Sequence, residues 1–495
     1  MKNKIVAFIL ITFTLFSAGC SNGNKKKGTG ATVESFMGGE DFVVFADLPC
    51  TGLTEKNLQE YLDCGFNVYQ LTEEDGKAIT DGTQNNGGLT DSYYNALSKL
   101  KAMDIDVFLR NHRNDPDYFV NTGEDWDKER TIYGVNYKLP YRNLTREDFA
   151  DFDNLAGFFI CDEPAYYAQS TSHNYFHAMA EYEKTVDWFN EYFSDKYFHM
   201  NLLPRYPESS TIYYTNPVDP LDAVTYEEYV DYYVEHFAKK IKGKKSICLD
   251  NYPFRTNAAG IGPSYYNNLL LFANKTRDCN RTIKNEAYKA NFGVVIQSFY
   301  DTMNRDIECA ADISFQLCVA MAMGARTFQY YLYSTIGSGA SAQVGIMSQG
   351  GGKRIYNYVK EANNAYLSFA DVLTNFEWQG CMPISAENET DRENVDGFAN
   401  MLNCLTMKQM GDLKGVQSYL DCLVGYYKKG KQPGYMVANC TLPSEGKRNT
   451  VILDFPGYEK VIIYHENGEY ETKDTVGGRI RITLEAGDGA FVVPV

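Results

Sequence analysis

The sequence predicts a (β/α)8 TIM barrel followed by a small antiparallel β-sandwich. From Asp41 onward, short apolar runs alternate with longer stretches of helical periodicity, which is typical of a parallel sheet covered by helices. Eight such strand and helix pairs fit into roughly 330 residues, the size of a barrel with inserted loops. After about Phe376 the pattern changes to short alternating runs broken by Gly, Asn and Pro, which indicates antiparallel strands. We therefore expect the barrel to span 41–375 and the sandwich to span 376–495.

The expected barrel strands are apolar runs rich in β-branched and aromatic residues. They lie, in order, at 42–47, 67–71, 105–110, 157–161, 197–203, 246–250, 292–297 and 327–333. Helical periodicity follows or separates them, and helices are expected at 54–64, 91–103, 173–193, 224–240, 264–275, 309–323 and 354–371. Thr54 has the side chain of an N-cap for the first of these helices.

A doubly wound open sheet is the alternative arrangement for alternating strands and helices. Such a sheet normally carries a glycine-rich phosphate loop after an early strand. Here the glycine-rich stretch GSGASAQVG follows the last strand instead, so the sequence favours the barrel. In the C-terminal part, ENGEY has the composition of a hairpin turn, and Ile480, Ile482 and Leu484 alternate with other residues as in a half-buried strand.

The N-terminus has the pattern of a secretory signal. Lys2 and Lys4 precede the apolar run IVAFILITFTLFSAG, which ends at Cys20 and is shorter than the roughly 20 residues that span a bilayer. The stretch LFSAGC resembles the lipobox of bacterial lipoproteins, in which the cysteine becomes the lipidated first residue. We therefore expect a signal peptide over 1–20, lipidation of Cys20, and a flexible polar tether over 21–40. The resemblance implies a cell-envelope protein, anchored in the membrane by lipid and facing outside the cytoplasm.

The composition bears on the classes of partner. The 64 acidic residues outnumber the 47 basic ones and give a formal net charge of −17, which argues against nucleic acid because clustered Lys and Arg normally meet a polyanion. The 39 Tyr offer flat apolar faces with a hydroxyl tip, which suit a cleft for sugars, and a general bias towards Tyr is the alternative. The 12 Cys include no CxxC pair, and His173 and His177 lack a third ligand, so we expect no disulfide framework, metal site or cofactor.

Polar and charged residues gather where the expected strands end. The active sites of such barrels lie at the carboxyl ends of the strands. The residues that fall there are Asp47, Arg110, Asp162, Glu163, Asn201, Asp250 and Gln297. A helix cap or a salt bridge at the rim is the alternative role for each of them, and the sequence DEP also has the pattern of a helix start.

Four ordered motifs carry a resemblance to a known family: AGFFICDEP at the fourth strand, LDNYPF at the sixth, FGVVIQSF at the seventh and FQLCVAMAMGARTFQYYLYST leading into the eighth. Together they resemble the catalytic barrels of bacterial glycoside hydrolases, in the clan that includes the family-42 beta-galactosidases and the family-5 glycanases. KRIYNYVKEANNAYLSF is similar to the last barrel helix of such proteins, and GDGAFVVPV to their C-terminal sandwich. The resemblance covers roughly 41–495.

The resemblance implies an acid/base residue after the fourth strand. In that clan the glutamate at this place, in an Asn-Glu-Pro or Asp-Glu-Pro setting, is the general acid/base, and the corresponding residue is Glu163. The chemistry needs a carboxyl that stays protonated near neutral pH, so that it can deliver a proton to the glycosidic oxygen. The neighbouring Asp162 and the apolar strand behind it both favour the protonated state.

The second carboxylate is where the sequence departs from the clan. The clan has a nucleophilic glutamate at the end of the seventh strand, where this sequence has Gln297. An amide cannot form the glycosyl ester. Asp250, at the end of the sixth strand, is the nearest substitute by topology, with Asp47 and Asp301 as further candidates.

The resemblance also implies contacts with a sugar. Relatives often carry a Trp platform just after the eighth strand, where this chain has Ser334, so Tyr331 and Tyr333 are the candidate stacking faces. Arg110 and His112, after the third strand, have donors for hydroxyl groups or a uronate carboxylate, and a loop held by salt bridges is the alternative for this cluster. The other candidate substrate-binding residues are Asp47, Asp162, Asn201, Tyr252 and Gln297.

Three functions remain open on the sequence. The first is a lipid-anchored glycoside hydrolase-like enzyme that cleaves an O-glycosidic bond of an oligosaccharide or glycan through paired carboxylates. The second is a non-catalytic carbohydrate-binding lipoprotein that kept the cleft of the barrel and lost the strand-7 nucleophile, as Gln297 indicates. The third is a cell-surface interaction or structural protein, which would bind no sugar.

Overall fold

The computed structural model describes most of the chain beyond its first thirty residues. The described residues are 31–49, 52–72, 80, 89–111, 116–120, 129–132, 135–138, 140, 142–164, 179–204, 226–256, 260–262, 264–348, 352–384 and 409–495. Cys20, His112, His173 and His177, which were named from the sequence, lie outside these ranges, as do the expected signal peptide and the first half of the expected tether.

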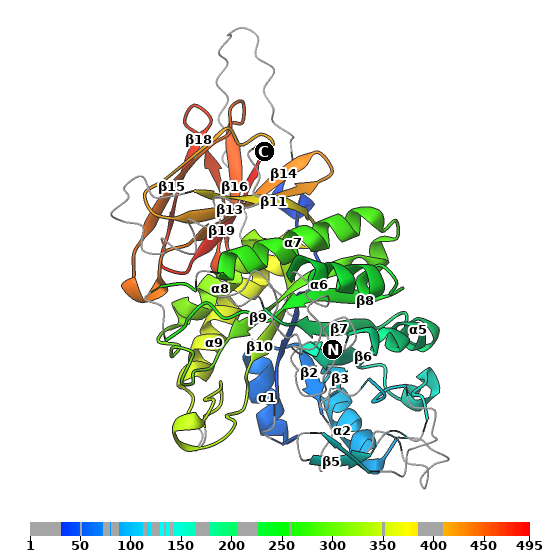
Figure 1. Cartoon of the computed structure of the whole chain (residues 1–495). Helices are drawn as coiled ribbons and strands as arrows, with labels where there is room; N and C mark the ends of the chain where they lie inside the picture. Colours follow the sequence, from blue (N-terminus) through cyan, green and yellow to red (C-terminus); the bar gives the residue numbers. More distant parts are fainter. Residues whose placement is uncertain are drawn as a thin grey trace, which may run out of the picture.

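Eight parallel strands form a nearly closed TIM barrel, and each lies where an apolar run predicts it (Figure 1). Their order around the barrel is β1-β10-β9-β8-β7-β6-β3-β2. The strands are β1 (Val43–Ala46), β2 (Val68–Leu71), β3 (Asp106–Arg110), β6 (Leu155–Asp162), β7 (Tyr197–Leu202), β8 (Lys244–Leu249), β9 (Ala290–Gln297) and β10 (Ala325–Tyr331). Between β3 and β6 the chain adds an antiparallel pair that the sequence analysis missed, β4 (Glu129–Ile132) and β5 (Val135–Lys138).

Helices follow the strands and cover the barrel. They are α1 (Glu55–Asp63), α2 (Asp91–Ala102), α5 (Glu183–Tyr192), α6 (Tyr226–Tyr233), α7 (Tyr265–Thr282), α8 (Ala310–Ala322), α9 (Arg354–Tyr366) and the short α10 (Ala370–Leu373). The hydroxyl of Thr54 accepts the backbone N–H of Asn57 at 3.3 Å, so Thr54 is the N-cap of α1 as expected. Among the described residues, no helix combines the length and the apolar content that crossing a bilayer requires.

Side chains close the seam between β1 and β2, which share no strand ladder. The hydroxyl of Tyr61, on α1, accepts the N–H of Ala46 at 2.9 Å and donates to the carbonyl of Val68 at 2.8 Å. Further along, Asn67 accepts the N–H of Val44 at 2.9 Å through its amide oxygen. These bonds pair backbone groups that a ladder would otherwise satisfy, so the barrel leaves no open strand edge at these points.

Aromatic side chains fill the inside of the barrel. Phe45 meets Phe108 edge-on at 5.4 Å between ring centroids, and Phe108 stacks on Tyr197 at the same distance. His199 is fully buried beside them and shares hydrogen bonds with Ser246 at 2.7 Å and with Gln329 at 2.9 Å. Burial lowers the pKa of His199 to about 4, so the ring is neutral. The interior is therefore a packed floor beneath the carboxyl ends of the strands.

Two antiparallel sheets form the C-terminal β-sandwich. One contains β11 (Glu377–Ile384), β13 (Cys422–Lys429), β14 (Gln432–Asn439), β19 (Gly489–Pro494), β16 (Lys460–Tyr464) and β17 (Tyr470–Asp474); the other contains β12 (Gly415–Ser418), β15 (Asn449–Asp454) and β18 (Arg479–Leu484). On β18 the expected alternation is present, because Ile480, Ile482 and Leu484 are buried while the residues between them are exposed. These side chains pack between the sheets with Tyr435 and Phe455.

Helix α8 lies between the barrel and the sandwich. Its sequence, AADISFQLCVAMA, is apolar on every side, as expected for a helix covered all round. A Cβ on Gly425, in β13, would lie 2.0 Å from the carbonyl oxygen of Ala322, so only glycine allows this approach. The indole of Trp378 donates to the same carbonyl at 3.0 Å. The sandwich therefore packs on the barrel through backbone as well as side chains.

The expectation of a flexible tether over 21–40 is wrong for its second half. Phe36 is buried against Phe376, with ring centroids 5.7 Å apart. The backbone N–H of Gly38 donates to the Asp371 carboxylate at 2.7 Å. Val33 and Phe36 are apolar side chains of this stretch that are buried in the core, and their burial holds these residues on the body.

We expect Tyr61→Phe to lower the free energy of unfolding by about 1–3 kcal/mol, because the N–H of Ala46 and the carbonyl of Val68 would lose their buried partner. Urea unfolding of the full chain measures the effect. Tyr464→Phe is the matched control, because that buried hydroxyl has no hydrogen-bond partner among the described residues. Equal losses in the two variants would show that the seam does not depend on the Tyr61 hydroxyl.

Candidate active site

Polar side chains at the carboxyl ends of six strands form one connected network. Asp47 follows β1, Gln70 lies near the end of β2, and Arg110 ends β3. Asp162 ends β6, Asn201 lies near the end of β7, and Asp250 follows β8. Neighbouring parallel strands place these residues along one rim, so side chains that are up to 203 positions apart in the sequence come together.

Arg110 is the cation at the centre of this network. Its guanidinium forms an ion pair with Asp47. It also donates to the Gln70 amide oxygen at 2.8 Å and to the Asp162 carboxylate at 3.0 Å. It also lies over the ring of Phe159, 4.7 Å from the ring centroid. Asp47 is fully buried, so its carboxylate depends on this partner. The positive charge of Arg110 is therefore shared between two acids.

A chain of hydrogen bonds continues from Asp162 to Asp250. The amide of Asn201 donates to Asp162 Oδ1 at 2.9 Å and reaches Asp250 Oδ2 at 3.4 Å. The hydroxyl of Tyr252 donates to the same Asp250 oxygen at 3.1 Å. The other oxygen of Asp250, Oδ1, is buried and has no hydrogen-bond partner among the described residues. One oxygen of Asp250 is thus held by two donors, while the other is buried without a hydrogen-bond partner among the described residues.

Glu163 follows β6 directly and is held by its backbone. Its N–H donates to the carbonyl of Asn201 at 2.9 Å, and its φ of 47° lies in the left-handed region that few residues other than glycine adopt. Burial raises the pKa of its carboxyl well above the ordinary value, and the charges of Asp250 and Asp162 raise it further. A strand that ends on two acids therefore produces one carboxyl that keeps its proton.

Asp250 is shifted in the same direction. Burial raises its pKa to about 7 and the charge of Asp162 adds to the effect, while the hydrogen bonds from Tyr252 and Asn201 oppose it. Glu163 and Asp250 each disfavour the ionisation of the other, so the two carboxyls titrate as a pair. Near neutral pH, such a pair can hold one proton and one negative charge.

Aromatic side chains stand beside Asp250. Tyr252 and Tyr331 are partly exposed, with ring centroids 6.2 Å apart, and Phe299 packs edge-on against both at 5.0 Å. The Tyr331 hydroxyl donates to the amide oxygen of Gln343 at 3.0 Å. This arrangement places two aromatic side chains beside Asp250.

Tyr333 does not form the expected stacking face. Only 1% of its surface is exposed, and its ring packs against Tyr61 at 5.2 Å and Phe66 at 6.1 Å. Its backbone N–H donates to the carbonyl of Asp47 at 2.9 Å. The chain continues past β10 alongside β1, and this directs the Tyr333 side chain into the core under α1.

Gln297 ends β9 as expected, but its side chain is fully buried and is not available to a substrate. Its amide oxygen accepts the N–H of Phe254 at 3.0 Å, and its amide nitrogen donates to the carbonyl of Arg305 at 3.0 Å. The residue joins the loop after β8 to the loop after β9. Its role in this structure is to position those loops, so the expectation of a substrate contact is corrected here.

Two further residues of the site were missed by the sequence analysis. Gln70 binds Arg110 and also accepts the N–H of Leu48 at 3.3 Å. A polar residue near the end of the apolar run NVYQL could have indicated that Gln70 belongs to the site. Gln343 binds Tyr331 and lies 3.4 Å from the carboxylate of Asp301, but it belongs to a loop without regular periodicity, so the sequence carries no signal for it.

Comparison with known proteins gives structural likenesses at low identity. No family model and no curated protein sequence matches the chain. Similar solved structures include a catalytic mutant of Gan42B, a GH42 beta-galactosidase from G. stearothermophilus (9% identity, 92% of this chain, 98% of that chain, TM-score 0.49). Others are a family 39 glycoside hydrolase from the gut symbiont Bacteroides cellulosilyticus WH2 (10%, 92%, 81%, 0.45) and a GH30 endoxylanase from Clostridium papyrosolvens C71 (12%, 92%, 97%, 0.40). With TM-scores below 0.5 they assign no activity to this chain, and the barrel rests on its own strand order.

We expect Asp250→Asn to gain stability relative to the wild type as the pH rises. The folded pKa of about 7 lies above the ordinary 3.8, so the wild type loses stability as the pH rises through this window and does not regain it above. The asparagine variant lacks this loss, and its free energy of unfolding relative to the wild type should rise by at least about 1 kcal/mol between about pH 4 and pH 8.

Urea unfolding at several pH values measures this difference. Asp153→Asn is the control, because Asp153 is exposed and its pKa is lowered by Lys101, which gives the opposite dependence on pH. A constant difference between Asp250→Asn and the wild type across this pH range would contradict the raised pKa of Asp250.

Proposed function

We propose that the chain binds a carbohydrate at the carboxyl ends of the barrel strands and hydrolyses an O-glycosidic bond there. The observation that carries the proposal is the pair Glu163 and Asp250, two acids whose pKa values are both raised by burial and by nearby negative charge. Acids with shifted pKa values at the carboxyl ends of TIM-barrel strands are typical of groups that act in acid/base catalysis.

In the proposed reaction, Glu163 is the general acid/base. Its protonated carboxyl donates to the glycosidic oxygen as the bond from that oxygen to the anomeric carbon breaks. Water then supplies the oxygen that bonds to the anomeric carbon, and its proton returns to a carboxylate. The raised pKa supports this role, because a carboxyl that were ionised at neutral pH would have no proton to give.

Asp250 is the proposed ionised partner. Tyr252 and Asn201 hold its Oδ2, which leaves Oδ1 to face the anomeric carbon as a nucleophile or to activate water as a base. Its negative charge also stabilises the oxocarbenium-like charge that develops on the sugar. Asp47 is a weaker candidate for this role, because it is fully buried and paired with Arg110.

Sugar binding is assigned to the surfaces around the pair. Tyr252 and Tyr331 offer aromatic faces for the apolar side of a pyranose ring. Asp162, Asn201 and Arg110 offer acceptors and donors for hydroxyl groups, although much of their capacity is already used within the network. His112 stays a prediction from the sequence.

The second candidate function is carbohydrate binding without catalysis. It is favoured by the end of β9, where Gln297 replaces a carboxylate and its amide is bound on both sides by backbone groups. In that case the acids would accept hydrogen bonds from sugar hydroxyls and no bond would be cleaved. The two functions differ in turnover and agree in requiring Tyr331.

We further propose that the protein is a lipid-anchored component of the cell envelope, facing outside the cytoplasm. The support is the sequence LFSAGC after an apolar run, followed by a Lys-rich polar stretch. The ordered chain begins to pack on the body near Val33, so the proposed linker between Cys20 and the body is short.

Glu163→Gln tests the acid. The amide keeps the shape of the side chain and loses the proton, so we expect kcat on unactivated oligosaccharides to fall by a factor of about 100 or more, with sugar affinity nearly unchanged. The loss should be smaller on aryl glycosides with good leaving groups, which need less protonation. Glu235→Gln, an exposed glutamate paired with Lys239, is the matched control and should keep full turnover.

Full turnover by Glu163→Gln on unactivated oligosaccharides would refute this assignment. A wild type that turns over no glycan, yet loses sugar binding on Tyr331→Ala, would instead establish the binding function.

Cys20→Ala tests the anchor. The thiol is the site of lipid attachment in the lipoprotein pattern, so we expect the variant to incorporate no labelled fatty acid and to leave the membrane fraction or remain unprocessed. Metabolic labelling followed by membrane fractionation measures both properties. Equal labelling of the variant and the wild type would disprove lipidation at Cys20.

A further inference from the structure

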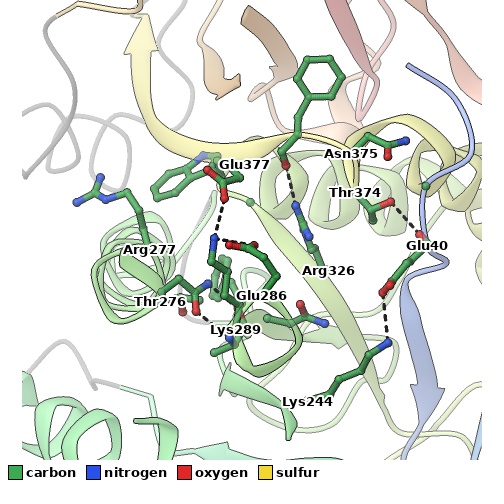
Figure 2. Close-up of a pocket in the computed structure, with 18 of the residues that line it drawn as sticks. Glu40, Lys244, Thr276, Arg277, Glu286, Lys289, Arg326, Thr374, Asn375 and Glu377 are labelled. Carbon is green, nitrogen blue, oxygen red and sulfur yellow. Dashed lines mark hydrogen bonds and ion pairs between the residues drawn. The ribbon is translucent and has the colours of Figure 1, made fainter. Parts of the chain in front are cut away.

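A cavity of about 750 Å3 lies at the opposite end of the barrel from the candidate active site. Its walls come from the first residues of β8, β9 and β10, from the C-terminal half of α7, and from the segment that leads into the sandwich, 374–379. The ordered N-terminal segment 38–41 lines another side (Figure 2). Four parts of the chain that are distant in sequence thus enclose one volume of the size that small-molecule sites occupy.

Most charged groups of this cavity neutralise each other. Lys289 forms ion pairs with Glu286 at 2.8 Å and with Glu377 at 2.7 Å. Lys244 pairs with Glu40 at 3.3 Å. Lys244 and Glu40 balance each other, whereas Lys289 faces two carboxylates; Figure 2 draws these ion pairs as dashed lines.

The two arginines of α7 are also engaged. Arg277 pairs with Asp278 at 2.9 Å, donates to the carbonyl of Gln379 at 3.0 Å and lies over the ring of Trp378. Arg281 pairs with the same Asp278 at 3.2 Å and is largely exposed. The two guanidiniums share the single carboxylate of Asp278.

Arg326 is different from these cations. It begins β10, is partly buried, and lies between the Lys289 group and the Lys244–Glu40 pair in Figure 2. One of its five N–H groups donates to the carbonyl of Phe376 at 2.7 Å. No carboxylate of the described residues lies within ion-pair distance of it. Burial lowers the pKa of Arg326, while Tyr427 and the carboxylates of Glu40 and Glu377, which form no ion pair with it, oppose this shift.

We propose that this cavity is a binding site for a small organic monocarboxylate, with Arg326 as its anchor. A guanidinium presents parallel N–H groups that match the two oxygens of a carboxylate, so the remaining donors of Arg326 would be satisfied by one such group. Phe292, Met323 and Trp378 line the same cavity and provide apolar surface for the body of the ligand.

The charges select a single negative charge. Arg326, which has no ion-pair partner among the described residues, matches one anionic group, whereas a second negative charge on the ligand would meet the carboxylates of Glu40, Glu286 and Glu377. A phosphate or sulfate dianion is therefore a poorer fit than a carboxylate. The inference does not depend on the proposed glycoside hydrolysis, because the cavity lies at the amino ends of the strands and shares no residue with the site around Glu163.

Isothermal titration of the full chain with sodium glucuronate tests the proposal. Glucuronate has one carboxylate on a sugar-sized body, glucose is the neutral control, and inorganic phosphate is the dianionic control. We expect saturable binding of glucuronate in the millimolar range or tighter, with no saturable binding of glucose or phosphate, to the Tyr331→Ala protein, in which the proposed sugar site at the other end of the barrel is impaired. Absence of saturable glucuronate binding, or equal binding of glucuronate and phosphate, would overturn the proposal.

Variants of the cavity residues show whether glucuronate binds at Arg326. Arg326→Gln should weaken glucuronate binding by a factor of about 10 or more, because it removes a charged hydrogen-bond donor. Arg326→Lys keeps the charge and loses the paired donors, so it should bind more weakly than the wild type and more tightly than Arg326→Gln. Arg281→Gln removes one positive charge from the rim of the same cavity and should bind within about twofold of the wild type.

Melting curves of each variant establish that it is folded before its binding is compared. If Arg326→Gln does not fold, the comparison of Arg326→Lys with Arg281→Gln decides, because only the first changes the proposed anchor. Equal binding by these two variants would overturn the proposal. Loss of glucuronate binding in Tyr331→Ala with full binding in Arg326→Lys would place the probe at the other end of the barrel and would also overturn it.

Discussion

The buried guanidinium of Arg110 is the interaction on which the mouth of the barrel depends. Four carboxyl groups meet at this rim, and Arg110 reaches two of them, Asp47 and Asp162, from the end of β3. Because these strands lie on both sides of β3, the ion pairs also tie β1 and β6 to it across the top of the packed aromatic interior. Removing one member of such a buried set would leave its partners charged and uncompensated, which is costly in a dry environment.

Arg110 does not pair with the remaining two acids, and their pKa values reflect this. Glu163 and Asp250 are buried near Asp162 and near each other, so each resists ionisation, and their pKa values rise together. The Asn201 amide connects Asp162 to Asp250, which places the compensated and the uncompensated acids in one network. The proposed chemistry uses this imbalance: one carboxyl retains a proton and the other carries the negative charge.

The two ends of the barrel differ in their balance of positive and negative groups. At the carboxyl ends, negative groups exceed the one buried cation. At the amino ends, the sandwich and the N-terminal segment close over the strands, and positive and negative groups lie together in ion pairs, whereas Arg326 has no ion-pair partner among the described residues. Helix α8 packs closely against the sandwich, because Gly425 allows the sandwich backbone to approach Ala322 directly. The sandwich therefore does more than extend the barrel, since it supplies walls to the cavity beneath it.

The sequence by itself determined the number, order and positions of the barrel strands, the alternation of β18 and the place of Glu163 at a strand end, because these follow from local periodicity and from which residue types end an apolar run. The tertiary structure alone decided which strand-end residues face the mouth. Tyr333 turned into the core, Gln297 bound two loops, Phe36 ordered part of the expected tether, and Tyr61 closed the seam between β1 and β2. The direction of a side chain and the partners of its polar atoms depend on residues hundreds of positions away, and local sequence carries no record of them.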